Sequence, residues 1–497
     1  MKVKFLLLLL IIICNSFLLV GQNDYWFNKG LKAKDTKDFE LAIDCFTKSI
    51  ERMGVYPATY NNRGNVYFEL RQYDKAIADY TSAIKLDPKD DYSFYMRGIV
   101  FNDLKQYDKA VADFSKAIDI YPKYTYAYYS RGTSYLALQH YDKAIADFTS
   151  AIRIDTGFTL AYNDRGLAYK NLQQYDNAIA DFTRVIAIDP KDTDAYNNRG
   201  ITYRNLKQYD KAIADYSQAI EIDSNYARAY NNRGVVYKDL QQYDKAIDDY
   251  SHAIEIDPKN PTAWYSRGNA YNDLQQYENA IADYSRAIEI DPEDTDAYYS
   301  RGIANRNIQQ YDRAISDFSK ALEIDPKYAY AYNGLGSTFS DLLQYNKAIA
   351  SYTRLIELDT GNIDGYLGLS LVYFKKNDYD SAIDILKKGM LQNPREAILY
   401  DDIGNIYIEK NDNENALSNF KKCLELDDKN LDATLGLAIV FYGNGDMINA
   451  KHYLDEAKEF ESRLQKGMDG IAELEKEGFT YSEKRKAILK KMFNELK

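Results

Sequence analysis

A period of 34 residues runs through this chain and limits the folds open to it. Glycine recurs at this spacing ten times in succession, at Gly30, Gly64, Gly98, Gly132, Gly166, Gly200, Gly234, Gly268, Gly302 and Gly336. Ser370 interrupts the series, Gly404 resumes it, and the small residue Ala438 takes the last place. A strict period of this length is typical of stacked supersecondary units and not of one globular core. Such a stack exposes a long surface, which favours binding over catalysis.

The repeat that begins at Pro57 predicts two helices joined by a short turn. Tyr60, Gly64 and Tyr67 follow at steps of four and three, which places them on one face of a first helix. A second helix with the same spacing begins after a polar turn at 70–73. Small residues allow the two helices to approach closely, and aromatic residues fill the space around them. Each repeat is therefore expected to be a hairpin with apolar surface left for its neighbour to cover.

Seven positions recur in register, here counted with Pro57 as the first place: Tyr60, Gly64, Tyr67, Ala76, Tyr80, Ala83 and Pro88. This pattern resembles the tetratricopeptide repeat. The resemblance implies an all-α fold, a right-handed superhelical solenoid of about thirteen repeats, over residues 23–464. All nine prolines occupy the first or thirty-second place, between hairpins, where no helical N–H is needed.

The charge and the chemistry of the chain exclude several classes of function. The net charge is −12 and the pI is about 5.0, which argues against nucleic acid as a partner, because phosphate binding needs a basic face. The three histidines fall at places that other repeats fill with ordinary polar residues or alanine. No metal-ligand spacing, nucleophile motif or phosphate loop is present in the sequence. We therefore expect no enzymatic activity, no metal or cofactor, and no small-molecule ligand.

The first 21 residues differ from the rest and predict a secretory signal peptide. Lys2 and Lys4 precede the apolar run 5–20, and the first repeat follows directly. Cleavage is expected after Gly21, with export to the periplasm, the envelope or the exterior. A lipid anchor on Cys14 and an uncleaved anchor are the alternatives, although the run is short for a membrane span.

Residues 465–497 fall outside the period and predict a final helix that Ser482 caps. Its apolar stripe consists of Ile488, Leu489, Met492, Phe493 and Leu496, and most of its other residues are basic. One interpretation is a capping segment that closes the open end of the solenoid. The other is a basic amphipathic helix for an acidic partner or for peripheral association with a membrane surface.

The seventh place departs from the family, which usually has leucine there. Arginine occupies it in eight successive repeats, and aspartate follows sixteen residues later in each, as in Arg63 with Asp79, Arg199 with Asp215 and Arg301 with Asp317. The other five repeats carry neither residue. A contact between the two helices of each hairpin would explain this, since a buried arginine requires a partner. Copying of one ancestral repeat would explain it without any contact.

The family resemblance places ligands in a concave groove lined by the first helices. The places expected to be exposed there hold Asn61, Asn62, Asn65, Asn163, Asn197, Asn198, Asn231 and Asn232, with Lys170, Arg204 and Lys238. Amides both donate and accept, which suits an extended peptide backbone of unspecified sequence. Ordinary solvent exposure of polar residues is the alternative explanation.

Together these features predict an exported, non-catalytic scaffold or adaptor that binds peptide segments of other proteins. A subunit of a polysaccharide-handling or secretion complex is one alternative. The regulatory arm of an enzyme on another chain is the second.

Overall fold

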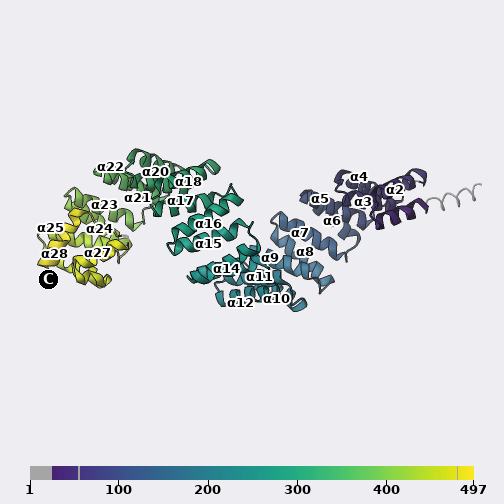
Figure 1. Cartoon of the computed structure of the whole chain (residues 1–497), viewed down its shortest axis with the longest axis horizontal. Coiled ribbons are helices and arrows are strands. Elements are labelled where there is room, and N and C mark those ends of the chain that lie inside the picture. Colours follow the sequence, from purple (N-terminus) through teal and green to yellow (C-terminus); the bar gives the residue numbers. More distant parts are fainter. Residues whose placement is uncertain (1–24, 54–55, 478, 497) are drawn as a thin grey trace, which may run out of the picture. The chain divides into compact units, whose positions relative to one another are not determined.

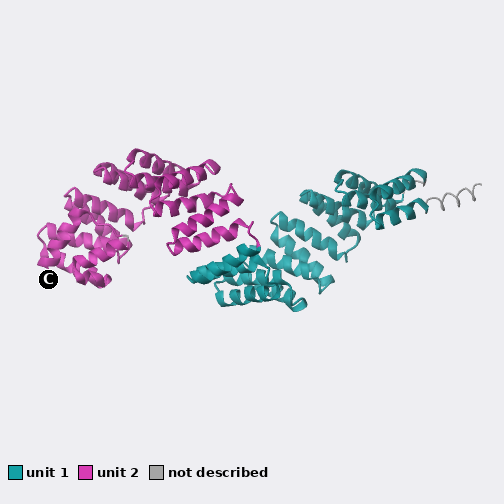
Figure 2. Ribbon diagram, viewed as in Figure 1, with its two compact units in different colours: residues 1–256 teal, residues 257–497 magenta. Residues whose placement is uncertain are grey.

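The computed structural model describes residues 25–53, 56–477 and 479–496, and the predicted signal peptide at 1–21 lies outside them. The described residues form α-helices and one 3-10 helix, with no strand among them. They divide into two compact units, residues 1–256 and 257–497 (Figure 2). Within the described part of the chain, no helix is both long and apolar enough to cross a membrane. The all-α prediction is confirmed.

Unit 1 consists of helix pairs that follow one another along the chain (Figure 1). Residues 25–35 are helical and pair with α2. The remaining bounds are α2 Phe39–Met53, α3 Pro57–Glu69, α4 Tyr73–Leu86, α5 Asp91–Asp103, α6 Tyr107–Ile120, α7 Thr125–Ala137, α8 Tyr141–Ile154, α9 Thr159–Asn171, α10 Tyr175–Ile188, α11 Thr193–Asn205, α12 Tyr209–Ile222, α13 Ala227–Asp239 and α14 Tyr243–Ile256.

Unit 2 continues the same order and ends with a segment outside the period. Its bounds are α15 Pro261–Asp273, α16 Tyr277–Ile290, α17 Thr295–Asn307, α18 Tyr311–Ile324, α19 Ala329–Asp341, α20 Tyr345–Leu358, α21 Ile363–Lys375, α22 Tyr379–Gln392, α23 Ala397–Glu409, α24 Asn413–Leu426, α25 Leu431–Gly443, α26 Met447–Phe460, η1 Ser462–Lys466, α27 Met468–Lys476 and α28 Glu483–Glu495. From α3 to α25, each first helix starts 34 residues after the previous one, as the glycine period predicts.

The turn inside each hairpin uses a left-handed residue where glycine is the usual choice. Arg71 has φ 55° and Gln241 has φ 58°. Gln72 N–H donates to Tyr67 O, and Arg71 N–H donates to Phe68 O, both at 2.8 Å. This pair of bonds satisfies carbonyl groups at the end of the first helix and sets the sharp reversal.

The hairpin core is a glycine packed against an aromatic ring. In the repeat that begins at Thr193, a Cβ on Gly200 would lie 2.7 Å from Tyr216 Cε1. Tyr216 and its neighbours Ala212 and Ala219 are completely buried. The predicted roles of the small and aromatic places are confirmed, because only a residue without a side chain allows this approach of the two helices.

The C-terminal segment packs on the last hairpins. Ser482 caps α28 as predicted, since its side chain accepts from Arg485 N–H. Leu489, Met492 and Leu496 are buried in the same core as residues of α24 to α27. Lys484 Nζ donates to the carbonyls of Ile408 and Glu409, which lie at the end of α23. Helix α28 thus covers apolar surface of the last repeats and also supplies a cation to a helix C-terminus.

Candidate interaction surface

Neighbouring first helices contact one another directly inside each unit, and hydrogen bonds 35 residues apart connect them. Asn198 Nδ2 donates to Asn163 Oδ1 at 3.0 Å, and Asn232 Nδ2 donates to Asn197 Oδ1 at 2.8 Å. In each bond the fifth place of one repeat meets the sixth place of the next. The first helices therefore present a continuous surface, not separate patches.

The predicted exposure of the asparagine row is wrong at two positions. Asn61 and Asn197 are 7% and 4% exposed. Asn61 is held from the next hairpin, where its Nδ2 donates to Asp90 Oδ2 and its Oδ1 accepts from Ser93 Oγ, both at 2.7 Å. The fifth place faces the first helix of the following repeat, which covers it. These amides connect repeats and are not free for a ligand.

The other predicted groove residues are half-buried, namely Asn62, Asn65, Asn163, Asn198, Asn231, Asn232, Lys170, Arg204 and Lys238. Arg204 Nε pairs with Asp239 Oδ2 at 2.8 Å, again between neighbouring first helices. Asn65 accepts from Tyr80 OH and donates to Tyr92 OH. Burial lowers the pKa of Lys170. Many polar side chains of this face thus form hydrogen bonds or ion pairs within the protein.

An arginine and an aspartate bridge the two helices of each hairpin in all eight repeats that carry both. The shortest N–O distances are 2.6–2.7 Å. Arg63 with Asp79 illustrates the geometry, because Nε donates to Oδ2 at 2.8 Å and Nη2 to Oδ1 at 2.7 Å. The aspartates are 4–6% exposed, and the arginine side chains 16–22%. A planar guanidinium fits a carboxylate in this two-bond arrangement, which lysine could not reproduce.

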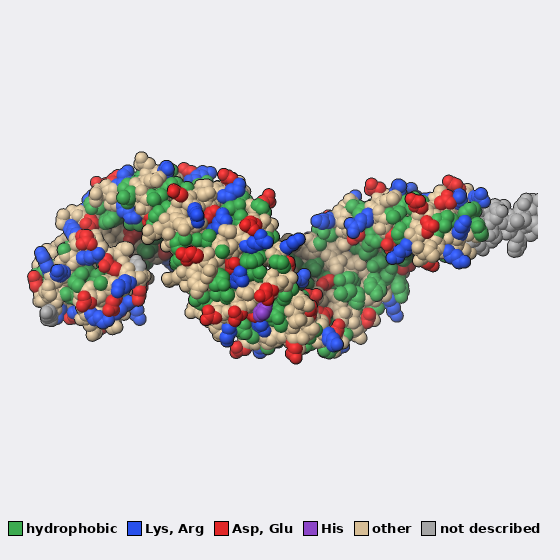
Figure 3. Space-filling model, in the orientation of Figure 1, with side chains coloured by type: hydrophobic (Ala, Val, Ile, Leu, Met, Phe, Trp, Pro, Cys, Tyr) green, Lys and Arg blue, Asp and Glu red, His purple; other side chains and the backbone are tan. Residues whose placement is uncertain are grey.

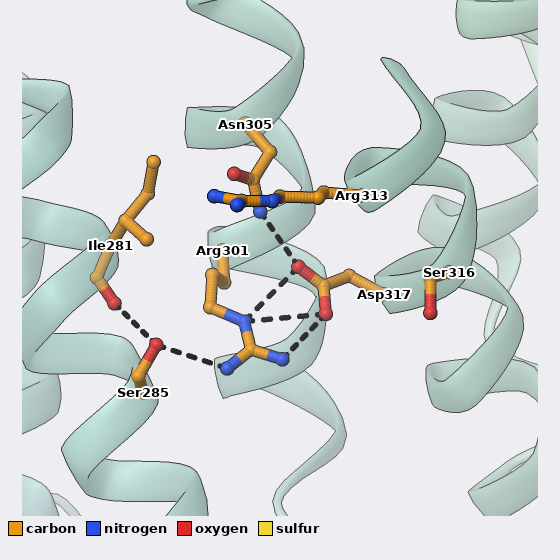
Figure 4. A pocket seen from close by; sticks show the side chains of 7 residues that line it. All are labelled: Ile281, Ser285, Arg301, Asn305, Arg313, Ser316 and Asp317. Atoms are coloured by element: carbon orange, nitrogen blue, oxygen red, sulfur yellow. Dashed lines mark hydrogen bonds and ion pairs between the residues drawn. The ribbon is translucent and has the colours of Figure 1, made fainter. Parts of the chain in front are cut away.

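The sequence reasoning missed a third partner of these arginines. Arg199 Nη1 donates to Thr183 Oγ1 at 3.0 Å, on the second helix of the preceding hairpin. Figure 4 shows the equivalent group in unit 2, where Arg301 lies between Asp317 and Ser285. At least seven of the eight arginines make this third bond and so connect three helices. The signal was in the sequence, because serine or threonine precedes each arginine of this series by sixteen residues.

Aromatic rings complete the surroundings of the arginine. The Arg199 guanidinium carbon lies 5.6 Å from the ring centre of Tyr196 and 6.0 Å from that of Tyr203. Hydrogen bonding to Asp215 raises the pKa of Arg199, against the opposing effect of burial. The arrangement stabilises the hairpin and leaves the guanidinium little capacity for a ligand.

The C-terminal segment adds a buried acidic cluster around one arginine. Arg485 is 3% exposed, and its Nη2 lies 3.6 Å from Asp432 Oδ1. Burial raises the pKa of Asp401, and it raises that of Asp402 to about 6, with the charge of Asp432 as a further cause. A cavity of about 430 Å³ lies beside this cluster, between α21, α23 and residues 480–485. The sequence showed Arg485 only as one of the basic residues of the final helix.

No group of three or more potential metal ligands occurs among the described residues. Cys45 and Cys423 are buried free thiols, and burial raises the pKa of Cys423. A raised pKa disfavours the reactive thiolate, so Cys423 is better explained as a packing residue than as a nucleophile.

Three solved structures illustrate the similarity of the chain to known proteins. YrrB, described as a TPR protein with an unusual peptide-binding site, is 28% identical over 37% of this chain and 95% of its own, with a TM-score of 0.33. The APC/C hetero-tetramer Cut9-Hcn1 is 16% identical over 86% and 97%, with a TM-score of 0.39. A tetratricopeptide repeat protein from Parabacteroides merdae is 20% identical over 50% and 99%, with a TM-score of 0.40. No curated protein sequence matched the chain.

Family matches cover most of the described residues. Tetratricopeptide repeat models match 24–52, 57–90, 92–124, 125–157, 159–192, 227–260, 295–328, 344–401 and 397–430. Further repeat models match 200–241 and 268–309, and 182–214 and 250–282. Single-repeat matches such as 57–90, 227–260 and 397–430 begin where a first helix begins, and the chain belongs to the tetratricopeptide repeat family.

Proposed function

We propose that the protein is an exported, non-catalytic scaffold that binds extended segments of other proteins along the face of its first helices. Tetratricopeptide arrays are in general interaction scaffolds, and the matched families are not catalytic ones. The main observation behind this proposal is the direct contact between neighbouring first helices, through hydrogen bonds such as that from Asn232 to Asn197. Within a unit, a continuous row of first helices gives an extended ligand one surface.

Photo-crosslinking from chosen positions tests the face and the class of partner together. A photoreactive residue in place of Arg228, on first helix α13, is expected to capture protein from an envelope extract. The same group in place of Leu391, which is 81% exposed on second helix α22, serves as the control. Capture from α22 alone would contradict the proposed binding face. Crosslinked partner material that a protease cannot digest would contradict a protein partner. Consistent capture of one catalytic subunit would favour the regulatory arm of an enzyme.

Export is part of the proposal and rests on Lys2, Lys4 and the apolar run 5–20. N-terminal sequencing of the mature protein should begin at Gln22 or within a few residues of it. Intact Met1 in a cytoplasmic fraction would refute cleaved export.

A further inference from the structure

An aromatic surface crosses three neighbouring first helices of unit 1, and it is called here the aromatic strip. It comprises Tyr92, Tyr95, Tyr124, Tyr126, Tyr129, Phe158 and Leu160. Figure 3 shows hydrophobic side chains gathered on this part of unit 1. Tyr126 is 58% exposed, Leu160 54% and Tyr92 38%. These large apolar groups remain in solvent although each belongs to a well-packed hairpin.

The rings of the strip contact one another across repeats. The ring centres of Tyr95 and Tyr124 are 4.9 Å apart. Phe158 lies edge-on to Tyr126 at 5.6 Å and to Tyr129 at 5.1 Å. These contacts hold the rings in place before a ligand arrives, so little side-chain freedom would be lost on binding.

The fold does not require large apolar residues at these places. Tyr126 and Leu160 occupy the second place of their repeats, where α11 has Asp194 and α13 has Arg228. Tyr129 occupies the fifth place, where α11 has Asn197. Helices α11 and α13 have polar residues at these places, and they begin and end at the same repeat positions as α7 and α9. The exposed aromatic character of α5, α7 and α9 is therefore additional to what the solenoid needs.

The charge around the strip selects the kind of partner. Apart from the ion-paired arginines, helices α5, α7 and α9 carry three carboxylates, Asp91, Asp103 and Asp164, and one amine, Lys170. Asp164 accepts from Tyr129 OH at 2.8 Å. Exposed tyrosine rings next to carboxylates attract cations through both the ring face and the negative charge.

At least two of the five tyrosine hydroxyls of the strip already have hydrogen-bond partners within the protein, which leaves fewer polar groups for a sugar. Tyr129 donates to Asp164, and Tyr92 OH accepts from Asn65 Nδ2 at 2.9 Å. Ring faces and edges are what the strip offers, and these suit apolar and cationic side chains. We propose that the aromatic strip is the docking surface for an extended peptide segment that combines apolar side chains with lysine or arginine. This inference rests on the proposed function and assigns it a place and a partner chemistry.

Binding of short labelled peptides to the full mature chain, measured by fluorescence anisotropy, tests the inference. One peptide alternates leucine with arginine, a second leucine with glutamate, and a third contains only serine and glycine. Maltoheptaose is the sugar probe. The leucine–arginine peptide is expected to bind most tightly. Equal or tighter binding of the leucine–glutamate peptide, no binding of any peptide, or binding of maltoheptaose that Tyr126→Thr abolishes would overturn the inference.

The variants use residues that the array already tolerates at the second place. Tyr126→Thr follows Thr262 of α15, and it should weaken the leucine–arginine peptide at least about tenfold, as for an aromatic hot spot. Leu160→Arg, which copies Arg228, should weaken binding far more than Leu160→Asp, which copies Asp194. Leu391→Ala, an exposed apolar truncation on α22, should leave binding unchanged, and circular dichroism should show unchanged helix content in every variant.

The failures of the two proposals can be told apart. If the leucine–arginine peptide binds Tyr126→Thr and Leu160→Arg as tightly as the unaltered chain, the strip is the wrong surface. Crosslinking from α13 to protein would still support the scaffold function in that case. If α13 captures no protein from the extract and no peptide binds the chain, the scaffold proposal fails together with the inference.

Discussion

Arg199 and Asp215 allow the energetic role of the ion pairs to be measured. The arginine makes two bonds to the carboxylate, at 2.7 and 2.8 Å, and a third to Thr183. Asp215 is 6% exposed, and the Arg199 side chain is 17% exposed. Removing one partner of a well-buried pair costs roughly 3–5 kcal/mol, because the other charge stays buried without compensation. Since Arg199 keeps some solvent contact, we expect about 2–4 kcal/mol for each single change.

The double variant Arg199→Leu with Asp215→Ser copies what the repeat at Ala329 already has in Leu335 and Ser351. In that repeat, Leu335 is 9% exposed and Ser351 Oγ donates to Lys347 O at 3.1 Å, so neither place contains an unpaired charge. The double change should therefore cost less than the sum of the single changes, with a coupling energy of about 1–3 kcal/mol.

Hydrogen exchange of α11 and α12, followed by mass spectrometry on the full chain, is the suitable measurement. A solenoid opens locally, so one global unfolding free energy would not describe this repeat. The same cycle read at α3 and α4, four repeats away, is the internal control and should show little change. Additive effects at α11 and α12 would refute the pairing argument, and shared ancestry would then explain the joint occurrence of the two residues.

Four further predictions test other parts of the structure. Gly200→Ala should destabilise its hairpin by about 1–3 kcal/mol in hydrogen exchange, because the new methyl group collides with Tyr216. Gln241→Gly should stabilise the α13–α14 turn by up to about 1 kcal/mol, since φ is 58° there, and a loss of stability would contradict this. Asn197→Ala should cost about 1–2 kcal/mol at α11 and α13, measured by local exchange. The pKa of Asp402 is raised to about 6, so the folded state holds its proton more tightly, and stability of the C-terminal segment should fall as pH rises from about 4 to 6. Because the pKa of Asp401 is raised as well, Asp402→Asn should weaken this dependence in exchange of α28 without removing it.

The period and its small residues were enough to predict the hairpins. Pro57 and Pro261 start α3 and α15, where a proline N–H would have no helical partner. Gly200 and Tyr216 were assigned correctly to the same interior, because the spacing within each helix fixes which residues share a face. Joint presence and absence suggested a contact between Arg199 and Asp215, and the structure has both bonds of that contact.

The asparagine row was judged from one hairpin alone, and this explains its error. On an isolated first helix, Asn61 would face solvent. In the array, the first helix of the next repeat supplies Asp90 and Ser93 to it. Burial at a contact between repeats depends on the angle at which hairpins stack, which the intrahelical spacing does not contain. The Thr183 bond was missed for the same reason, because it joins two different repeats.

Arg485 shows where a periodic sequence gives no information. It lies outside the repeats, and its partner Asp432 occupies a second place that holds aspartate in other repeats as well, such as Asp194 and Asp296. A pair of residues that occurs once cannot be told from coincidence in the sequence, whereas the arginine–aspartate pair recurs in eight repeats. For the aromatic strip, the informative signal is a difference between repeats and not a recurrence. Tyr126 and Leu160 are recognisable because they differ from counterparts such as Asp194 and Arg228 in hairpins of the same bounds. Places where an array departs from its own repeat are therefore where a specific partner is best sought.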